Sequence, residues 1–540
     1  MLIVIIIFLI SILFINLYKS KRNLHMMQQN LYNENNRYEK WQLKNRKQFV
    51  TIELFAVVVS IVSLFIRFDT YLLNTLPILV ISIIFLLEGL HYRKFILTDQ
   101  NKKKLVITSR IKRLINTTII LYLIPLILLI IFRHDYDTCW MLVFIITIMT
   151  YLNSLVVLIA MWINTPIEKM VYLYYKNKAQ SKLDSMSNLK IIGITGSYGK
   201  TSSKNVLSDI LNIKYNALPT PKNLNTFNGL IMTVNNHMDK FTDIFIAEMG
   251  AYVKGEIKRL CKLVKPKYGI LTRIGTAHLE SFGSQENIQE GKFELIESLP
   301  SDGFGILNGD DPLQVNYKLK NKVKIIWIGI ENKDADVLAT NIKCSSKGTS
   351  FDVVLKNDKN KYRFETKLLG NHNVYNILAG IACGIEFGID IASLQKAVAG
   401  VKPIEHRLEI KSIGNFNMID DAYNSNPTGA ANACKVLSMM PGIKIVVTPG
   451  MIELGDKEDE YNKEFGKQIA EVADYVLLIG EKKTKPIKEG LEEKGFDKDK
   501  IEVFNDVREA YPFISNIASQ SKKEVYALFE NDLPDTYNEK

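Results

Sequence analysis

The chain has 540 residues, which is enough for two to four domains that each bury a core of their own. Its 68 Lys and Arg outnumber its 57 Asp and Glu, so the formal net charge is +11. Many of the basic residues lie between long apolar runs in the first third of the chain. That placement favours a membrane surface as their partner, and we expect no nucleic-acid binding.

Five apolar runs are long enough to cross a membrane, since a helical span needs roughly 17–25 residues. They are Leu2–Leu17, Phe49–Ile66, Tyr71–Leu90, Thr117–Phe132 and Trp140–Ile163. The first run has no basic stretch before it and no small-residue cleavage site after it. We therefore expect an uncleaved span there and not a signal peptide.

The distribution of Lys and Arg predicts how these spans are oriented. Basic residues crowd the segments after the first and third runs, whereas the other two connections are short and hold one Arg each. Because basic loops stay in the cytoplasm, we expect the N-terminus outside and everything after the fifth run in the cytoplasm. Glu53 and Glu88, near the cytoplasmic ends of their runs, are expected to extend toward the membrane surface.

A phosphate-binding loop follows at "GITGSYGKTSSKN", residues 193–205, between a short buried strand and a helix. The usual pattern G-x-x-x-x-G-K-[ST] would need its first glycine at 194, where Ile194 stands instead. Lys200 would neutralise the β- and γ-phosphate oxygens, and the Thr201 hydroxyl would hold Mg²⁺. We therefore expect ATP and Mg²⁺ as cofactors.

The rest of the chain alternates strands and helices, which predicts α/β domains with mostly parallel sheets. Residues 338–368 instead show the alternating pattern of an antiparallel hairpin insert, and the strand–helix alternation restarts after Pro403. We predict four parts: a helical membrane region, a juxtamembrane linker, a central P-loop ATPase-like domain and a C-terminal Rossmann-like domain. Their expected bounds are 1–165, 166–187, 188–403 and 404–540.

The motifs of the second half resemble, in order, those of the Mur ligase family, the ATP-dependent enzymes that build the cell-wall peptide. "TGSYGKT" at 195–201 fits that family's T-G-[TS]-x-G-K-[TS] loop, which accounts for the displaced glycine. The motifs that follow are "TPKNLNTFNGL", "AEMGA", "AHLESFGS", "EGKFELIESLP", "LNGDD", "GNHNVYNILA", "HRLE" and "DDAYNSNP". The resemblance covers about residues 188–540.

The resemblance implies a role for particular residues. Those implied to contact the nucleotide are Thr195, Gly196, Ser197, Gly199, Lys200, Thr201, Ser202, Asn308, Asp310, Asn373, Asn376, Arg407, Asp421 and Asn424. Those implied to hold Mg²⁺ are Thr201, Glu248, His278 and, as a carbamylated lysine, Lys292. Those implied to act in catalysis are Lys200, Lys292, His278 and Arg407.

The residues themselves leave alternatives open at four of these positions. His278 is equally well interpreted as a loop or capping histidine. Lys292, between Glu290 and Glu294, is equally a solvated lysine. Asp421 and Asn424 either orient the nucleotide or the amine, or form part of an Asx-rich turn.

The resemblance implies amide-bond formation through an acyl phosphate, with an amino acid or a dipeptide such as D-Ala-D-Ala added to a cell-wall precursor. Two departures bear on the substrates. Only about 25 residues separate the last apolar run from the loop, too few for a UDP-sugar-binding domain, so a lipid-linked or poly-γ-glutamyl acceptor stays open. The end "ALFENDLPDTYNEK" stands where the family often has Lys-Gly/Ala-Ser-Arg, so the amine either lacks the usual carboxylate or binds through another residue.

Two further functions are weighed against a membrane-anchored ligase. An ATP-driven transporter would need an ABC signature or a strand ending in a Walker-B Asp, and the sequence shows neither. A scaffold that has lost its activity is opposed by the intact Lys200, Thr201 and Glu248. We therefore expect a multi-pass protein of the cell membrane, in contact with membrane lipid, whose catalytic domains are cytoplasmic.

Overall fold

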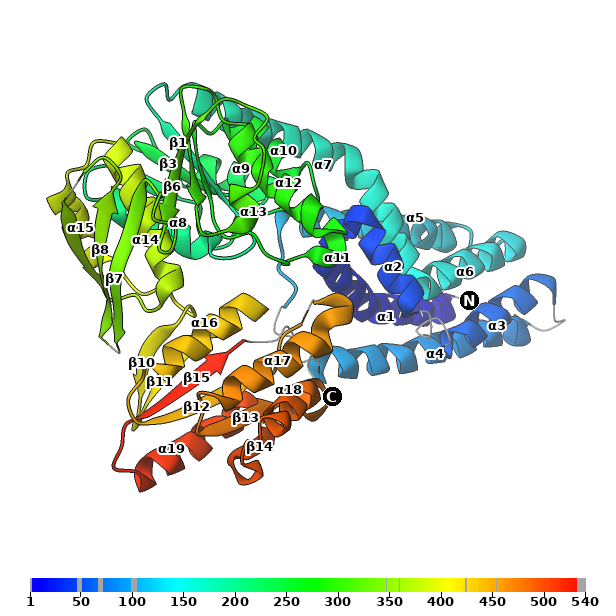
Figure 1. Cartoon of the computed structure of the whole chain (residues 1–540). Coiled ribbons are helices and arrows are strands. Elements are labelled where there is room, and N and C mark those ends of the chain that lie inside the picture. The colour runs from blue at the N-terminus through cyan, green and yellow to red at the C-terminus, as the bar shows by residue number, and fades with distance from the viewer. Residues whose placement is uncertain are drawn as a thin grey trace. The chain divides into compact units, whose positions relative to one another are not determined.

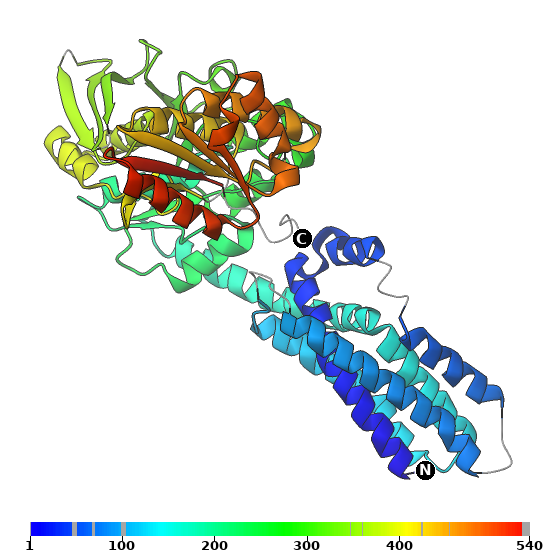
Figure 2. The same ribbon diagram turned by 90° about the horizontal axis from the view of Figure 1, so that it is seen from below.

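The computed structural model describes residues 2–45, 51–66, 71–98, 104–345, 347–358, 360–422, 425–452 and 454–531. Its internal contacts divide the chain into two compact units, Met1–Tyr174 and Tyr175–Lys540. The first unit is helical, and the second contains two α/β domains (Figures 1 and 2). Each unit is described by itself.

The first unit consists of helices. They are α1 (Leu2–Gln29), η1 (Leu31–Asn36), α2 (Arg37–Lys44), α3 (Glu53–Phe65), α4 (Tyr71–Thr98), α5 (Ser109–Ile131), α6 (Tyr136–Tyr151) and the start of α7 (Asn153–Asp184). Within the described ranges, 4 helices are long and apolar enough to cross a membrane: α1, α5, α7 and residues 73–94 of α4. The apolar helices α3 and α6 are shorter.

The last apolar run, expected as one span over Trp140–Ile163, is bent in the structure. Helix α6 ends at Tyr151 and α7 begins at Asn153. The N–H of Leu152 donates to the Ile148 carbonyl, and its own carbonyl accepts from the N–H of Val156. Backbone hydrogen bonding therefore continues through the bend. Most of the segment expected as a linker, 166–187, is the continuation of α7.

One acidic side chain of this unit lies where we did not expect it. Glu53 is 0% exposed and forms an ion pair with Lys19 of α1. Lys19 Nζ also donates to the carbonyls of Thr150 at 3.0 Å and Tyr151 at 2.9 Å, where α6 ends. The expectation that Glu53 extends to the membrane surface is wrong, because a buried counter-charge makes its own burial tolerable. Glu88 is also buried.

The first domain of the second unit is built on a nine-stranded sheet in the order β2-β3-β1-β4-β5-β6-β7-β8-β9. The strands are β1 (Lys190–Thr195), β2 (Ala217–Pro219), β3 (Ile244–Glu248), β4 (Tyr268–Leu271), β5 (Phe304–Asn308), β6 (Lys324–Gly329), β7 (Val337–Ser345), β8 (Gly348–Leu355) and β9 (Lys361–Thr366). Pairing is parallel as far as β7 and antiparallel from β7 to β9. The expected hairpin insert is thus three strands that extend the main sheet.

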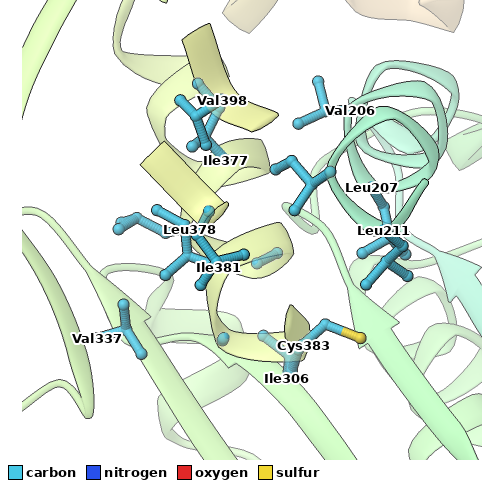
Figure 3. Close-up of a cluster of buried hydrophobic side chains, with 14 of the residues drawn as sticks. Val206, Leu207, Leu211, Ile306, Val337, Ile377, Leu378, Ile381, Cys383 and Val398 are labelled. Atoms are coloured by element: carbon cyan, nitrogen blue, oxygen red, sulfur yellow. The ribbon is translucent and has the colours of Figure 1, made fainter. Parts of the chain in front are cut away.

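Helices cover both faces of this sheet, which is why its central strands are apolar throughout. One face carries α8 (Lys200–Leu211), α14 (Asn371–Glu386) and α15 (Ile391–Gly400); the other carries α9 (Phe227–Asn236), α10 (Glu256–Val264) and α12 (Gln285–Glu297). The short helices α11 (Leu279–Phe282) and α13 (Pro312–Val315) lie in the loops. Leu207 of α8 and Ile377 of α14 belong to the buried cluster of Figure 3. This packing fixes the phosphate loop against the start of α14.

The second domain has a six-stranded sheet in the order β10-β11-β15-β12-β13-β14, parallel except for β10. Its strands are β10 (Glu409–Ile413), β11 (Phe416–Asp421), β12 (Ile443–Thr448), β13 (Tyr475–Ile479), β14 (Ile501–Phe504) and β15 (Val525–Glu530). Helices α16 (Pro427–Ser438), α17 (Glu458–Ala470) and α18 (Glu481–Glu493) bury one face, and α19 (Ala510–Gln520) buries the other. The predicted fold class, two α/β domains after apolar helices, is confirmed.

Candidate active site

The phosphate loop joins β1 to α8 and is held from behind by Thr272, which follows β4. The Thr272 N–H donates to the Thr195 carbonyl at 2.8 Å, and its hydroxyl donates to the Tyr198 carbonyl at 2.6 Å. A Cβ on Gly196 would lie 1.9 Å from Thr272 Oγ1, so only glycine fits there. Gly199 has a φ of 79°, which glycine adopts without strain, and it caps α8. The glycines at 196 and 199 are therefore set by this backing strand.

The side chains of the loop mostly hold the loop itself. The Thr195 hydroxyl donates to the Met249 carbonyl at 2.9 Å, and the Ser197 hydroxyl to the Gly275 carbonyl at 3.1 Å. The N–H groups of Ser197 and Tyr198 donate to the Arg273 carbonyl. The N–H groups best placed for a phosphate are therefore those of the first turn of α8, which helical bonding leaves without acceptors.

Lys200 lies over this loop. Its Nζ donates to the carbonyls of Gly196 at 2.8 Å and Ser197 at 3.2 Å. Burial lowers its pKa; the carboxylate of Glu248 opposes that shift, and the charge of Arg407 adds to it. A cation with so few negative neighbours suits an incoming polyanion such as a triphosphate.

Glu248, at the end of β3, connects the loop to its surroundings. Its Oε1 accepts from the Thr201 hydroxyl at 3.1 Å and from the Asn225 amide at 3.0 Å. Its Oε2 lies 2.9 Å from Nζ of Lys204, which also donates to the Lys222 carbonyl at 2.6 Å. The structure thus brings the predicted ligands Thr201 and Glu248 together.

Lys204 and Asn225 are not among the site residues predicted from the sequence. Lys204 follows Lys200 by four residues and so lies on the same side of α8, which was the available signal. Asn225 belongs to the quoted motif "TPKNLNTFNGL". Lys204 is 1% exposed, which no sequence pattern shows.

The oxygen atoms of Thr201 and Glu248 suit Mg²⁺, which usually combines one or two carboxylates with substrate phosphates and water. In the described part of the chain, no three His, Cys, Asp or Glu side chains gather closely enough to hold a metal. These residues therefore fit an ion that is completed by the phosphates of a nucleotide. They do not fit a metal enclosed by protein side chains alone.

His278 is surrounded by groups that favour its neutral form. It lies before α11 with a φ of 63°, and its ring centre is 4.4 Å from that of Tyr252. Burial, and then the charges of Lys200 and Lys292, lower its pKa to about 4. A neutral imidazole keeps the lone pair that a metal ligand needs, so the geometry fits the implied role.

Lys292 is not a solvated lysine. It is 1% exposed, and its Nζ lies 3.4 Å from the Ala251 carbonyl and 5.2 Å from the ring centre of Phe282. Burial, and then the charge of Lys200, lower its pKa to about 7. The alternative that the sequence leaves open, a solvated lysine, is therefore wrong. A neutral amine is the form that carbamylation requires.

Asp310 organises the loops at the ends of β5 and β6. Its carboxylate accepts the Tyr375 hydroxyl at 2.8 Å and backbone N–H groups from Ile330, Glu331 and Asn332. The N–H of Asp310 donates to Asn308 Oδ1 at 2.9 Å. Asn308 and Asp310, the two residues of "LNGDD" implied to contact the nucleotide, therefore have hydrogen-bond partners within the protein. Tyr375 connects Asp310 to α14.

The first turn of α14 borders the phosphate loop. Asn376 donates to Asn373 at 3.2 Å, and Asn373 donates to the Leu369 carbonyl at 2.9 Å. A Cβ on Gly199 would lie 3.7 Å from Asn376 Oδ1. Ser202 is buried in the first turn of α8. Asn373 and Asn376 of "GNHNVYNILA" are thus placed beside the site where a nucleotide would bind.

Arg407 and Asp421 belong to the C-terminal domain. Arg407 is half-buried, and its charge acts on Lys200, His372 and Asp421. Burial raises the pKa of Asp421 to about 6, against the effect of Arg407. Asn424 lies outside the described residues. The charge of Arg407 therefore acts both on Lys200 of the phosphate loop and on Asp421 at the end of β11.

Comparison with known proteins places these features in a family. The model of the Mur ligase middle domain matches residues 194–384, and that of the Mur ligase glutamate ligase domain matches residues 406–523. The UDP-N-acetylmuramoyl-tripeptide–D-alanyl-D-alanine ligase of Bacillus subtilis (strain 168) is 35% identical over 336 residues, which are 61% of this chain and 71% of that enzyme.

Two solved structures show the same likeness. A crystal structure of MurF from Acinetobacter baumannii superposes with a TM-score of 0.60 at 28% identity, covering 67% of this chain and 77% of that one. MurF from Thermotoga maritima, in complex with ADP, superposes with a TM-score of 0.58 at 26% identity, covering 66% and 80%. The family matches begin at residue 194, beyond the helical unit.

Proposed function

Because this chain belongs to the Mur ligase family of ATP-dependent, ADP-forming ligases, we propose that it adds an amino acid or dipeptide to a cell-wall peptide precursor. The name of the Bacillus subtilis relative makes D-Ala-D-Ala the leading amine. The observation that carries the proposal is the P-loop site, in which Thr201 donates to Glu248 beside Lys200, and the charge of Lys200 acts on His278 and Lys292.

The proposed reaction has two steps. The acceptor carboxylate attacks the γ-phosphate of ATP to form an acyl phosphate and ADP, and the amine then displaces phosphate from the acyl carbon. The protein's work is chiefly to position groups and neutralise charge. Lys200 would leave the loop carbonyls and bind the phosphate oxygens. Mg²⁺, held by Thr201 and Glu248, would neutralise charge on the transferring phosphoryl group.

We further propose that Lys292 works as a carbamate. Addition of CO₂ to its neutral amine would give a carbamate anion in place of the buried amine, and the charge of Lys200 acts at this position. Support comes from the charges of Lys200 and Lys292, which lower the pKa of His278, and from the charge of Lys200, which lowers the pKa of Lys292. The carbamate oxygens and the His278 imidazole would then supply ligands for a second ion.

We also propose that the helical unit anchors the enzyme in the cell membrane with its catalytic domains in the cytoplasm. The four long apolar helices support this location. They also favour a second candidate function, the same ligation on a lipid-linked acceptor, because they precede the family domains directly. A poly-γ-glutamyl acceptor is a further version of this candidate.

The deciding experiment measures ADP release by the detergent-solubilised full chain. The acceptors are a UDP-muramoyl tripeptide, a lipid-linked muramoyl peptide and a γ-glutamyl peptide, each with and without D-Ala-D-Ala. We expect one acceptor to support ADP release, and Lys200→Ala to lower that rate about 10²–10³-fold. The control is Lys262→Ala, an exposed lysine of α10. Full activity of Lys200→Ala would reject the P-loop assignment.

A further inference from the structure

One lysine beside the candidate active site has a backbone conformation that a side chain disfavours. Residues 221–224 form a turn, in which the Leu224 N–H donates to the Pro221 carbonyl at 3.1 Å. Lys222, the first central residue of this turn, has a φ of 49°. Turns with a positive φ at that position usually have glycine there, because glycine adopts it without strain. Strain of this kind in a residue with a long side chain is typical of functional sites.

The turn is fixed next to the phosphate loop by a buried side chain of α8. Lys204 Nζ donates to the Lys222 carbonyl at 2.6 Å and lies 2.9 Å from Glu248 Oε2. Asn225, just after the turn, donates its side-chain amide to Glu248 Oε1 at 3.0 Å. The same carboxylate accepts from the Thr201 hydroxyl. The backbone of Lys222 is therefore connected, through one ammonium group, to the carboxylate of the P-loop site.

The ammonium group of Lys222 is not used by the fold. The side chain is exposed, and among the described residues none forms an ion pair or a side-chain hydrogen bond with it. Glu248 is already paired with Lys204, so it does not account for a second cation. A cation whose backbone is fixed and whose charge has no partner is suited to bind an anion from outside the protein.

We propose that Lys222 binds an anionic group of the acceptor, a phosphate or a carboxylate, and so determines part of the acceptor specificity. The proposal rests on the proposed ligase function. The phosphates of ATP already have Lys200 and the first turn of α8 as their binding groups. Helix α7 ends at Asp184 and β1 begins at Lys190, so no further domain stands between the helical unit and the phosphate loop. The acceptor therefore depends on contacts such as this turn.

The test measures the KM of the acceptor and the KM of ATP separately, from ADP release by the detergent-solubilised full chain. The acceptor is UDP-muramoyl tripeptide, or whichever acceptor of the panel above supports ADP release. Lys222→Asn removes the charge and leaves a residue that tolerates a positive φ. We expect the acceptor KM to rise about tenfold, which corresponds to one lost charge-assisted hydrogen bond, and the KM of ATP to stay within about twofold. Lys222→Arg, which keeps a cation, should return the acceptor KM toward that of wild type.

The matched control is Lys265→Asn. Lys265 is also an exposed lysine, and its φ of 50° is nearly the same, but it follows α10 and precedes β4, at the other edge of the sheet. Its replacement should leave both KM values unchanged. Lys222→Asn should not lower the midpoint of denaturant unfolding, because the hydrogen bond from Lys204 to the carbonyl of residue 222 is kept. That measurement separates a lost acceptor contact from a damaged fold.

If the active acceptor carries a diphosphate, the same molecule without it identifies the bound anion. A rise in KM for the diphosphate form alone assigns Lys222 to the diphosphate, and an equal rise for both forms assigns it to a carboxylate. A rise in the KM of ATP alone, or no rise in either KM, would overturn the inference and leave the proposed function intact. If wild type releases no ADP with any acceptor of the panel, the proposed function fails, and the inference fails with it.

Discussion

Lys292 shows how burial and a neighbouring positive charge can change what a side chain is able to do. Its folded pKa of about 7 lies well below the ordinary lysine value of 10.5. Between these two values the unfolded chain holds the proton and the folded chain does not. The free energy of unfolding therefore rises with pH between about 7 and 10.5. The stability gained in this way is lost as pH falls back toward 7.

The matching prediction concerns Lys292→Met, a substitution of similar length that cannot be charged. The measured quantity is the free energy of unfolding of wild type minus that of the variant, in buffer freed of CO₂. We expect this difference to rise by about 1.4 kcal/mol for each pH unit between 7.5 and 9. Below pH 7 the difference should stay constant. Thermal unfolding in detergent at several pH values measures it, with the exposed Lys262→Met as the control. A difference that does not change with pH would show that Lys292 keeps its charge in the fold.

Lys204 gives a second prediction at this scale. Its Nζ is the cation next to Glu248 Oε2, and both side chains are only 2% exposed. Lys204→Met should destabilise the domain by about 3–5 kcal/mol, because it leaves an uncompensated buried carboxylate. Adding Glu248→Gln should restore much of that stability but none of the activity. Denaturant unfolding of the two single variants and the double variant measures these changes in the free energy of unfolding. If the loss in the double variant equals the sum of the two single losses, the residues are independent.

These residues also show which parts of the site can be predicted from the sequence and which cannot. Lys200 and Thr201 could be predicted because a phosphate loop is a local motif with a fixed spacing. Lys204 could not, because its importance comes from burial and from partners far along the chain, the Lys222 carbonyl and Glu248. Those contacts exist only once β3 and α8 have packed together.

At the scale of elements, the phosphate loop depends on the strand behind it. Thr272, after β4, fills the space that a side chain at 196 would need. We expect Gly196→Ala to displace the loop and to weaken ATP binding by at least tenfold. Equilibrium binding of a fluorescent ATP analogue measures this. Gly400→Ala, where an added methyl meets nothing within 4 Å, is the control.

A paired change makes this prediction sharper. Thr272→Ala removes the oxygen that lies 1.9 Å from the added Cβ, so it should recover part of the binding in the Gly196→Ala background. Alone, Thr272→Ala loses the hydrogen bond to the Tyr198 carbonyl and should weaken binding mildly. If the double variant binds no better than Gly196→Ala, the φ of 150° at this position, and not the contact with Thr272 Oγ1, is the cause.

Elements differed in how well the sequence predicted them. The buried parallel strands β1, β3, β4 and β5 are short apolar runs with clear ends, as the predicted strand–helix alternation requires. The edge strands β2 and β10 show no such run, because an edge strand needs little apolar pattern of its own. The bend at Leu152 was also missed, since hydropathy stays high on both sides of it and only backbone geometry marks it.

At the scale of the whole molecule, catalytic domains of a known family follow a helical unit that the family models do not cover. The basic connections after α1 and after α4 predict which ends of the helices face the cytoplasm. Because hydrogen bonding continues from α6 into α7, we expect these two helices to cross the membrane as one bent span. Together with α1, α3, α4 and α5, this gives five crossings.

Cysteine labelling in intact cells tests this arrangement. With the five native cysteines replaced by alanine, we introduce single cysteines as His134→Cys, Asn45→Cys and Lys402→Cys, all at exposed positions. A membrane-impermeant maleimide should label His134→Cys from outside, because the connection between α5 and α6 is expected to lie outside. The other two should react only after permeabilisation, since they are expected in the cytoplasm. Labelling of Lys402→Cys in intact cells would place the ATP site on the side without ATP and would reject five crossings.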